Sequence, residues 1–180
     1  MGRNPGGKDR PSVAGLLYRM PSMLGGKAAA PSIVEFLAGV PAFQGVTRKE
    51  LNQLASVMLE RSYGDGESIF DQGTPSAAFY LIRNGSVDMF RSAGGTDVLI
   101  ATLGPNEHFG ELALLLDEAP RQISATSRGP SDLLALSRPD FETLIERSPV
   151  VCLKIFRVLS RVVALRFKML LEAIEGSAAE

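Results

Sequence analysis

The first part of the chain with a regular hydrophobic pattern has the spacing of helices. Residues 33–37 carry one helical signal, and a second, amphipathic run begins at Thr47 and continues to about residue 60. Thr47-Arg-Lys-Glu50 is a capping box, in which the Thr47 side chain caps the first turn while Glu50 reaches back. These patterns predict a helical N-terminal lobe.

From Tyr63 onward the pattern changes to short apolar runs separated by Gly, Asn and Pro. The runs cover residues 68–70, 78–82, 86–90, 98–103, 122–127 and 133–136. Asn84-Gly85 stands between two of them and predicts a tight hairpin. The recurring turn signals favour a small antiparallel barrel or sandwich.

Two helices are predicted to close the chain. Ser137 and Ser148 each precede a proline in a first turn, which indicates helices over about 139–147 and 149–173. Two neighbouring apolar stripes follow the longer helix, and together they are wider than contact with one barrel requires. We therefore expect part of this helix to meet a second copy of the chain and form a homodimer. The alternative is that both stripes are covered within one monomer.

Composition excludes several kinds of site. The chain has 180 residues with a net charge of −1, and it contains a single histidine, His108, and a single cysteine, Cys152. One chain therefore cannot supply a His/Cys metal cluster, an iron–sulfur site or a disulfide framework, and metal-binding cupins are excluded. No metal or cofactor is expected. The scarcity of cysteine fits a reducing compartment, so we expect a cytoplasmic protein.

Charge is distributed unevenly along the chain. Residues 1–31 contain five basic side chains and one acidic one, whereas the remainder contains 14 basic and 19 acidic residues. Together with its Gly and Pro content, this predicts a flexible basic arm over 1–31. Residues 13–20 could alternatively form a short helix on a partner. No transmembrane segment is predicted, because the apolar stretch 150–171 contains five Lys and Arg residues.

The segment from Phe109 to Arg121 carries the clearest chemistry. Gly110 permits a backbone conformation that other residues avoid, so that residues 111–116 can form a short helix whose first amides point outward as an anion site. Arg121 adds a positively charged guanidinium group, whose planar set of N–H donors is suited to phosphate oxygens. A carboxylate at Glu111 beside a bound anion makes sense only if the ligand also donates a hydrogen bond, as a ribose hydroxyl does, or if Glu111 pairs with an arginine.

This segment resembles the phosphate-binding cassette of the cyclic nucleotide-binding domain, found in catabolite activators, protein kinase A regulatory subunits and cyclic nucleotide-gated channels. The likeness runs from about residue 32 to residue 171, and it includes 69–73, 80–85, 103–104 and 133–136. It implies a mainly β, α+β fold: an antiparallel β-roll or jelly-roll barrel flanked by N-terminal helices and a long C-terminal helix. The domain would cover 32–173, followed by a tail at 174–180.

The resemblance also implies roles for individual residues. Gly110, Glu111 and the following amides of Leu112 and Ala113 would contact phosphate and ribose, with Glu111 accepting from the ribose 2′-hydroxyl. Arg121 would pair with the cyclic phosphate, and the last helix would close over the base. The separation of ten residues between Glu111 and Arg121 is similar to that of the bacterial activators.

The chain departs from the family pattern in three places. Gln122 and Ile123 are bulkier than the usual small residues after the arginine, although Gln122 can still donate a hydrogen bond. On the last helix, Arg166 can stack on or hydrogen-bond a base, or it can be one more solvated basic residue. His108 is expected to serve packing.

These observations predict a stand-alone cyclic nucleotide sensor whose C-terminal helix moves on binding and controls an unknown protein effector. We expect cyclic AMP as the ligand, with cyclic GMP or a cyclic dinucleotide left open. The alternative is a degenerate interaction or dimerisation module in which Glu111 and Arg121 form a structural salt bridge. An enzyme is not expected, because no nucleophile, metal constellation or hydrolase motif is evident. Seven residues after Ala173 are too few for a helix-turn-helix, so direct sequence-specific DNA binding is not expected either.

Overall fold

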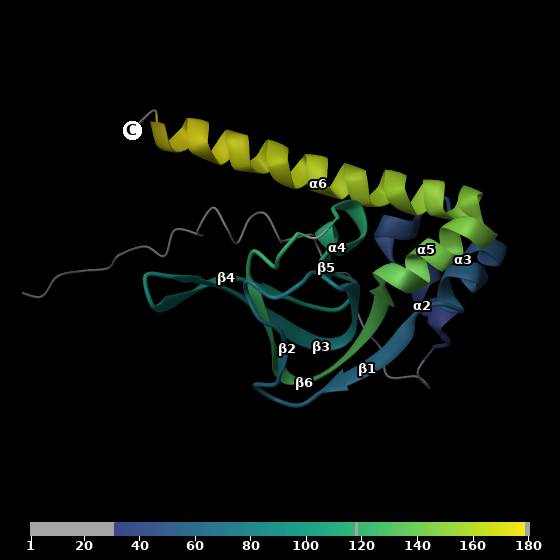
Figure 1. Ribbon diagram of the computed structural model, residues 1–180, viewed down its shortest axis with the longest axis horizontal. Helices are drawn as coiled ribbons and strands as arrows, with labels where there is room; N and C mark the ends of the chain where they lie inside the picture. The colour runs from purple at the N-terminus through teal and green to yellow at the C-terminus, as the bar shows by residue number, and fades with distance from the viewer. Residues whose placement is uncertain (1–30, 118, 179–180) are drawn as a thin grey trace, which may run out of the picture.

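The computed structural model describes residues 31–117 and 119–178 (Figure 1). The basic arm predicted over 1–31 lies outside these residues, apart from Pro31. The described chain begins with two short α-helices and a 3₁₀ turn: α2 (Ile33–Gly39), η1 (Pro41–Phe43) and α3 (Arg48–Ala55). The capping box at Thr47 is confirmed, since its hydroxyl accepts from the Glu50 amide at 3.4 Å. The helix ends at Ala55, before the predicted residue 60, because the next residues enter the sheet.

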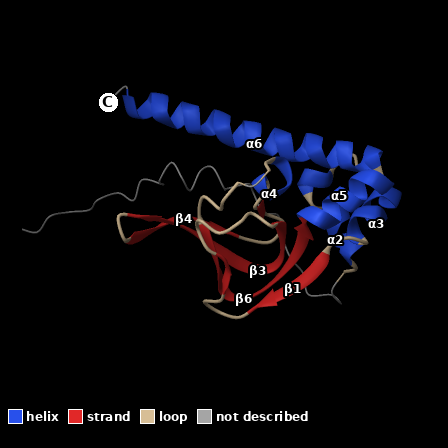
Figure 2. Ribbon diagram, viewed as in Figure 1, coloured by secondary structure: helices blue, strands red, loops and turns tan. Residues whose placement is uncertain are grey.

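The sheet contains six antiparallel strands (Figure 2). They are β1 (Leu59–Tyr63), β2 (Ser68–Phe70), β3 (Ala78–Ala93), β4 (Thr96–Leu103), β5 (His108–Phe109) and β6 (Ser124–Ser137). The order is β1-β6-β3-β4, with β2 added to β6 and β5 added to β3. The mainly β, α+β class with flanking helices is confirmed. The sheet is not closed into a barrel, because β1 and β4 end the order and do not pair with each other in the described chain.

The hairpin predicted at Asn84-Gly85 is wrong, because β3 runs straight through it as one 16-residue strand. Both halves of β3 pair with β6, and the register shifts around Asn84. Gly85 adopts a φ of +81° at this irregularity. The tight turn lies instead at Gly94-Gly95, between Ala93 of β3 and its partner Thr96 of β4.

Helices cover one side of the sheet (Figures 1 and 2). The short helix α4 (Leu112–Leu115) lies between β5 and β6, and α5 (Arg138–Arg147) and α6 (Pro149–Ala178) follow β6. The predicted starts of α5 and α6 are confirmed to within a residue, and α6 continues past the predicted residue 173. None of the described helices is long and apolar enough to cross a bilayer.

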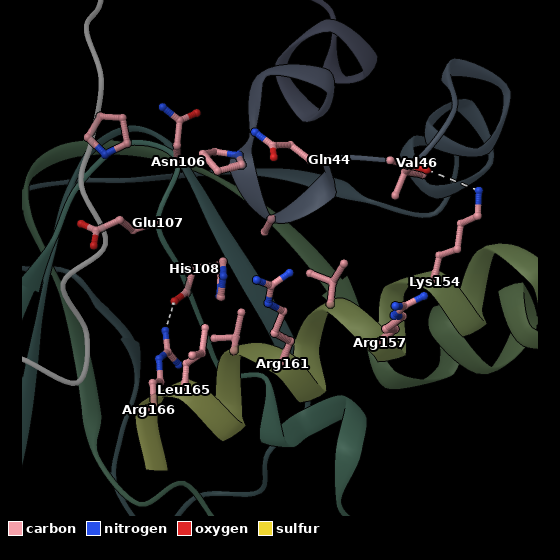
Figure 3. Close-up of a pocket in the computed structure, with 16 residues that line it drawn as sticks. Gln44, Val46, Asn106, Glu107, His108, Lys154, Arg157, Arg161, Leu165 and Arg166 are labelled. Carbon is pink, nitrogen blue, oxygen red and sulfur yellow. Dashed lines mark hydrogen bonds between the residues drawn. The ribbon is translucent and has the colours of Figure 1, made fainter. Parts of the chain in front are cut away.

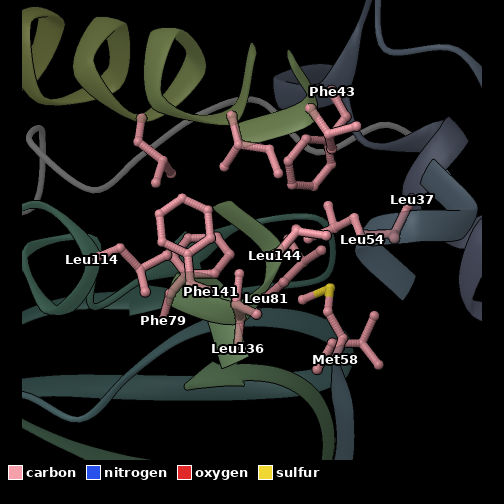
Figure 4. Packing of buried hydrophobic residues seen from close by; sticks show 14 of the residues in the cluster. Leu37, Phe43, Leu54, Met58, Phe79, Leu81, Leu114, Leu136, Phe141 and Leu144 are labelled. Atoms are coloured by element: carbon pink, nitrogen blue, oxygen red, sulfur yellow. The ribbon is translucent and has the colours of Figure 1, made fainter. Parts of the chain in front are cut away.

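A hydrophobic core joins the helices to the sheet (Figure 4). Phe79 and Leu81 of β3 pack there with Phe141 and Leu144 of α5. The first half of α6 contributes five buried residues, namely Val151, Cys152, Ile155, Leu159 and Val162. Much of the apolar surface from which we predicted dimer contact is therefore covered within the monomer, although other apolar residues of α6 remain exposed.

Candidate functional site

Gly110 connects β5 to α4 in a conformation that favours glycine. Its φ is +80°, and a Cβ atom placed there would lie 2.8 Å from both the Ala78 carbonyl oxygen and Nη1 of Arg121. The missing side chain therefore allows the Arg121 guanidinium to lie directly against the backbone at the start of α4. This confirms the predicted glycine conformation.

Arg121 is buried, with 6% of its surface exposed. Its Nη2 donates to the Ala78 carbonyl at 2.7 Å, and its Cζ lies 3.9 Å from the centre of the Phe70 ring. Its Nε is buried and has no hydrogen-bond partner among the described residues. Burial lowers the pKa of the guanidinium, partly offset by Tyr80 and by the negative charge of Glu111.

In the described part of the chain, no carboxylate forms a salt bridge with Arg121. The Glu111–Arg121 bridge on which the interaction-module alternative depends is therefore not formed. Glu111 instead pairs with Arg166 of α6, whose Nη1 lies 2.7 Å from Glu111 Oε1. A carboxylate at this position was explained either by a hydrogen-bond donor on the ligand or by pairing with an arginine. The structure shows pairing with an arginine, which lies 55 residues later in the chain.

Glu111 and His108 form a second contact at the same oxygen. His108 Nδ1 lies 2.6 Å from Glu111 Oε1, and Glu111 is 4% exposed. Burial by itself would raise the pKa of Glu111, but the His108 hydrogen bond and the positive charge of Arg166 outweigh it and lower the pKa. The carboxylate is therefore held in its ionised form.

Arg166 links α6 to β5 as well as to α4. Its Nη2 donates to the His108 carbonyl at 3.1 Å, the bond drawn dashed in Figure 3. From the sequence we expected this side chain either to contact the base or to lie in solvent. The structure places it on the carboxylate of the cassette, where it ties the last helix to the site.

The remaining predicted residues differ in their positions. Leu112 and Ala113 form the first turn of α4, and the Ala113 amide donates to the Gly110 carbonyl at 3.0 Å. Gln122 is exposed, and its Nε2 donates to the Pro120 carbonyl at 3.2 Å. The structure thus gathers Gly110, Glu111, Arg121 and Arg166 around α4, whereas the Gln122 side chain turns to its own backbone.

Sequence reasoning missed three side chains of this cluster. His108 was expected only to pack; it contacts Phe79 at a ring separation of 5.6 Å but also binds Glu111. The short separation of the two residues in the sequence was the available signal, although His108 lies in β5 and Glu111 at the start of α4. Phe70 and Tyr80 flank the Arg121 guanidinium from β2 and β3, and no local pattern pairs them with it. Within the described chain, no group of three or more His, Cys, Asp or Glu residues is placed to hold a metal ion.

Comparison with known proteins agrees with this geometry. Residues 60–148 match the family model described as the cyclic nucleotide-binding domain. This range contains β2 to β6 and the whole cluster around α4 except Arg166.

A curated relative and a solved structure, both from Thermus thermophilus, are similar to this chain over most of its length. The curated cyclic AMP receptor protein is 40% identical over 126 residues, which cover 69% of this chain and 58% of that protein. The crystal structure of the catabolite activator protein has a TM-score of 0.64 at 37% identity, covering 75% of this chain and 63% of the other. The chain thus spans about three fifths of the length of these relatives.

A third comparison concerns the fold alone. The crystal structure of a cyclic nucleotide-binding domain from Methylobacillus flagellatus has a TM-score of 0.70 at 23% identity. The match covers 81% of this chain and 82% of that domain. The arrangement of sheet, flanking helices and C-terminal helix is therefore shared by a domain of similar extent.

Proposed function

Because this chain belongs to the cyclic nucleotide-binding domain family, we propose that it binds a cyclic nucleotide, cyclic AMP in preference to cyclic GMP, at Gly110, Glu111 and Arg121. The observation that carries the proposal is the state of Arg121. Its guanidinium is buried, its Nε has no hydrogen-bond partner among the described residues, and no described carboxylate forms an ion pair with it. A buried charge without a counter-charge costs several kcal/mol, roughly, and a phosphate would supply both the charge and the missing acceptor.

The surroundings of Arg121 favour a phosphate over a carboxylate side chain. Because Gly110 has no side chain, Nη1 lies against the backbone that leads into α4, and the N-terminal residues of α4 follow directly. A phosphate placed there can accept from the guanidinium fork and from backbone amides together. Among the described residues, Glu111 pairs with Arg166 rather than with Arg121, and the proposal takes the guanidinium of Arg121 as the partner of the phosphate.

Glu111 provides the connection from ligand to helix. We propose that a ribose hydroxyl donates a hydrogen bond to the Glu111 carboxylate. The hydroxyl binds there either beside Arg166 or in its place. Since Arg166 holds α6 to both Glu111 and the His108 carbonyl, a ligand at this carboxylate changes how firmly α6 is held. The equilibrium between alternative positions of α6 would then shift. The size of the shift is set by the difference in the ligand's affinity for those positions. Control of a protein effector through α6 is the output we propose.

We also propose that the chain acts as a homodimer through the exposed face of α6. Every third or fourth residue from Val150 is exposed, in the alternating three-four spacing of a coiled-coil seam. The positions are Val150, Leu153, Arg157, Ser160, Ala164, Phe167 and Leu171. The buried residues Ile155 and Val162 lie on the other side of the helix, so the monomer's core and this seam do not compete.

Titration calorimetry tests ligand binding directly. We expect cyclic AMP to bind the wild-type chain, and Arg121→Met to abolish measurable binding, because it removes the proposed phosphate partner and retains a side chain of similar length. Arg128→Met is the matched control, since Arg128 is an exposed arginine of β6 outside the cluster. Absence of heat in the wild type, together with an unchanged melting temperature at millimolar ligand, would refute the proposal.

A further inference from the structure

A cavity borders His108 and is lined by residues outside the turn and arginine of the cassette. Its volume is about 710 Å³, within the usual range for small-molecule sites, and it opens between residues 41–46, residues 105–108 and α6 (Figure 3). Neither Gly110 nor Arg121 lines it. It is therefore a separate space from the site proposed for the cyclic nucleotide.

The lining of this cavity is strongly basic in a chain whose net charge is −1. Four basic residues of α6 line it, Lys154, Arg157, Arg161 and Arg166, against one acidic residue, Glu107. The Glu107 carboxylate accepts from the Gly104 amide at 2.7 Å, so it is committed to the turn between β4 and β5. A cleft lined by charges of one sign attracts ligands of the opposite charge.

Two of the four cations already have partners. Lys154 Nζ lies 2.8 Å from Glu50 Oε2, and Arg166 is held by Glu111. Arg157 and Arg161, in contrast, form no ion pair and no hydrogen bond with any residue in the described ranges. They are four residues apart on α6 and so share one face of the helix. Figure 3 shows Arg161 reaching from α6 into the space below Gln44.

The rest of the lining is mainly apolar. Side chains from three segments contribute, namely Pro41, Ala42, Val46, Pro105, Val158, Val162 and Leu165. A ligand that fills this cavity thus meets two unpaired guanidinium groups and an apolar wall. Two cations one helical turn apart match two linked phosphate groups better than one, and guanidinium is suited to phosphate oxygens.

We propose that this cavity is a second ligand site, which binds a small organic diphosphate through Arg157 and Arg161 and packs the organic part against the apolar wall. The site does not depend on the cyclic nucleotide proposal, because its two anchoring residues lie outside the cassette. It does adjoin that site, because His108 and Arg166 line the cavity and also bind Glu111.

Calorimetry of the full chain with ADP and with inorganic pyrophosphate tests this proposal. We expect ADP to bind, pyrophosphate to bind more weakly because it has no organic part, and both to weaken with salt. Combined Arg157→Gln and Arg161→Gln should reduce the ADP affinity about tenfold or more, since two charge-assisted contacts are lost. Arg157 also stands in the proposed dimer seam, so the double variant alters both; Arg161→Gln alone leaves the seam unchanged and should give part of the loss.

Lys168→Gln is the matched control, because Lys168 is an exposed cation of the same helix that does not line the cavity. It should leave the ADP affinity within about twofold of wild type, since no proposed contact is lost. Excess cyclic AMP should leave ADP binding in place. The proposal is wrong if ADP does not bind, if the double variant binds it as well as wild type, or if cyclic AMP displaces it completely. ADP binding without cyclic AMP binding would instead refute only the cyclic nucleotide proposal.

Discussion

At the scale of single residues, Arg121 carries a positive charge into a part of the protein that water scarcely reaches. Phe70 covers one face of the guanidinium, and the Ala78 carbonyl accepts from Nη2, yet Nε has no partner in the described chain. Cation–π contact and one hydrogen bond recover only part of the cost of burying a charge. Such a residue is expected where function requires it at the expense of stability.

This argument predicts that Arg121→Met stabilises the ligand-free chain. Met fills a similar space beside Phe70 and carries no charge to desolvate, so we expect the free energy of unfolding to rise by about 1 kcal/mol. Urea denaturation without ligand measures it. Arg128→Met, at an exposed position, should change stability little. A marked loss of stability in Arg121→Met would mean that the charge is already well compensated in the empty site.

The Arg166–Glu111 contact predicts a dependence of stability on pH. Because the folded protein lowers the pKa of Glu111 from its ordinary value of 4.5, its contribution to stability is present above pH 4.5 and is lost as the pH falls through the folded pKa. Arg166→Ala removes one cause of that lowering. We expect this variant to lose about 2 kcal/mol at pH 7 and to approach wild type in acid.

Urea denaturation at pH 7 and at an acid pH below the lowered pKa of Glu111 distinguishes the charge from simple packing. Lys168→Ala serves as the control, since Lys168 is an exposed residue of the same helix. A loss that is equal at both pH values would show that Arg166 acts through its aliphatic stem rather than through Glu111.

At the scale of elements, the outcome of sequence reasoning depended on whether the determining contact was local. The caps at Thr47 and Ser137 set helix starts that the structure reproduces, because a cap acts within one turn. Asn84-Gly85 has the local chemistry of a hairpin, but pairing of both flanking segments with β6 keeps β3 continuous. The strand Leu59–Tyr63 was missed for the same reason, since its partner lies about 70 residues away.

The residues of the candidate site also divide into those that local sequence predicts and those that depend on distant contacts. Gly110, Glu111 and Arg121 could be read from one segment of 13 residues, because a tight turn, a short helix and a following arginine are close in sequence. The partner of Glu111 could not, because Arg166 reaches it from a different helix. The aromatic side chains beside Arg121 likewise come from two separate strands.

Gly85 allows a sharp prediction about β3. A Cβ atom there would lie 2.3 Å from Ser131 Oγ and 2.5 Å from the Pro130 carbonyl oxygen, in addition to the strain of a positive φ. Gly129 also has a positive φ, +74°, but a Cβ there would have nothing within 4 Å. We expect Gly85→Ala to destabilise the fold by about 3 kcal/mol and Gly129→Ala by about 1 kcal/mol. Equal losses in thermal or urea denaturation would show that strain alone decides the cost.

At the scale of the whole molecule, α6 has two roles on two sides. One side closes the core with Ile155 and Leu159, while Arg166 fastens the helix to the cassette. The opposite side exposes the three-four seam, in which Leu153 is 70% and Phe167 59% exposed. In the proposed dimer, a partner helix of the same kind would cover these exposed apolar residues. A helix that senses the site on one side and meets its copy on the other would transmit binding to the dimer.

The seam therefore predicts that Phe167→Glu makes the chain monomeric. Glutamate at this seam position would place two like charges opposite each other in a parallel dimer and remove two apolar contacts. Light scattering after size exclusion should give a dimer mass for the wild type and a monomer mass for the variant. Glu172→Lys, beside the seam on the same helix, should remain dimeric. A monomeric wild type would disprove the dimer. A dimeric Phe167→Glu variant would show that the interface lies elsewhere. A monomeric variant that still binds cyclic AMP would show that one chain contains the whole ligand site.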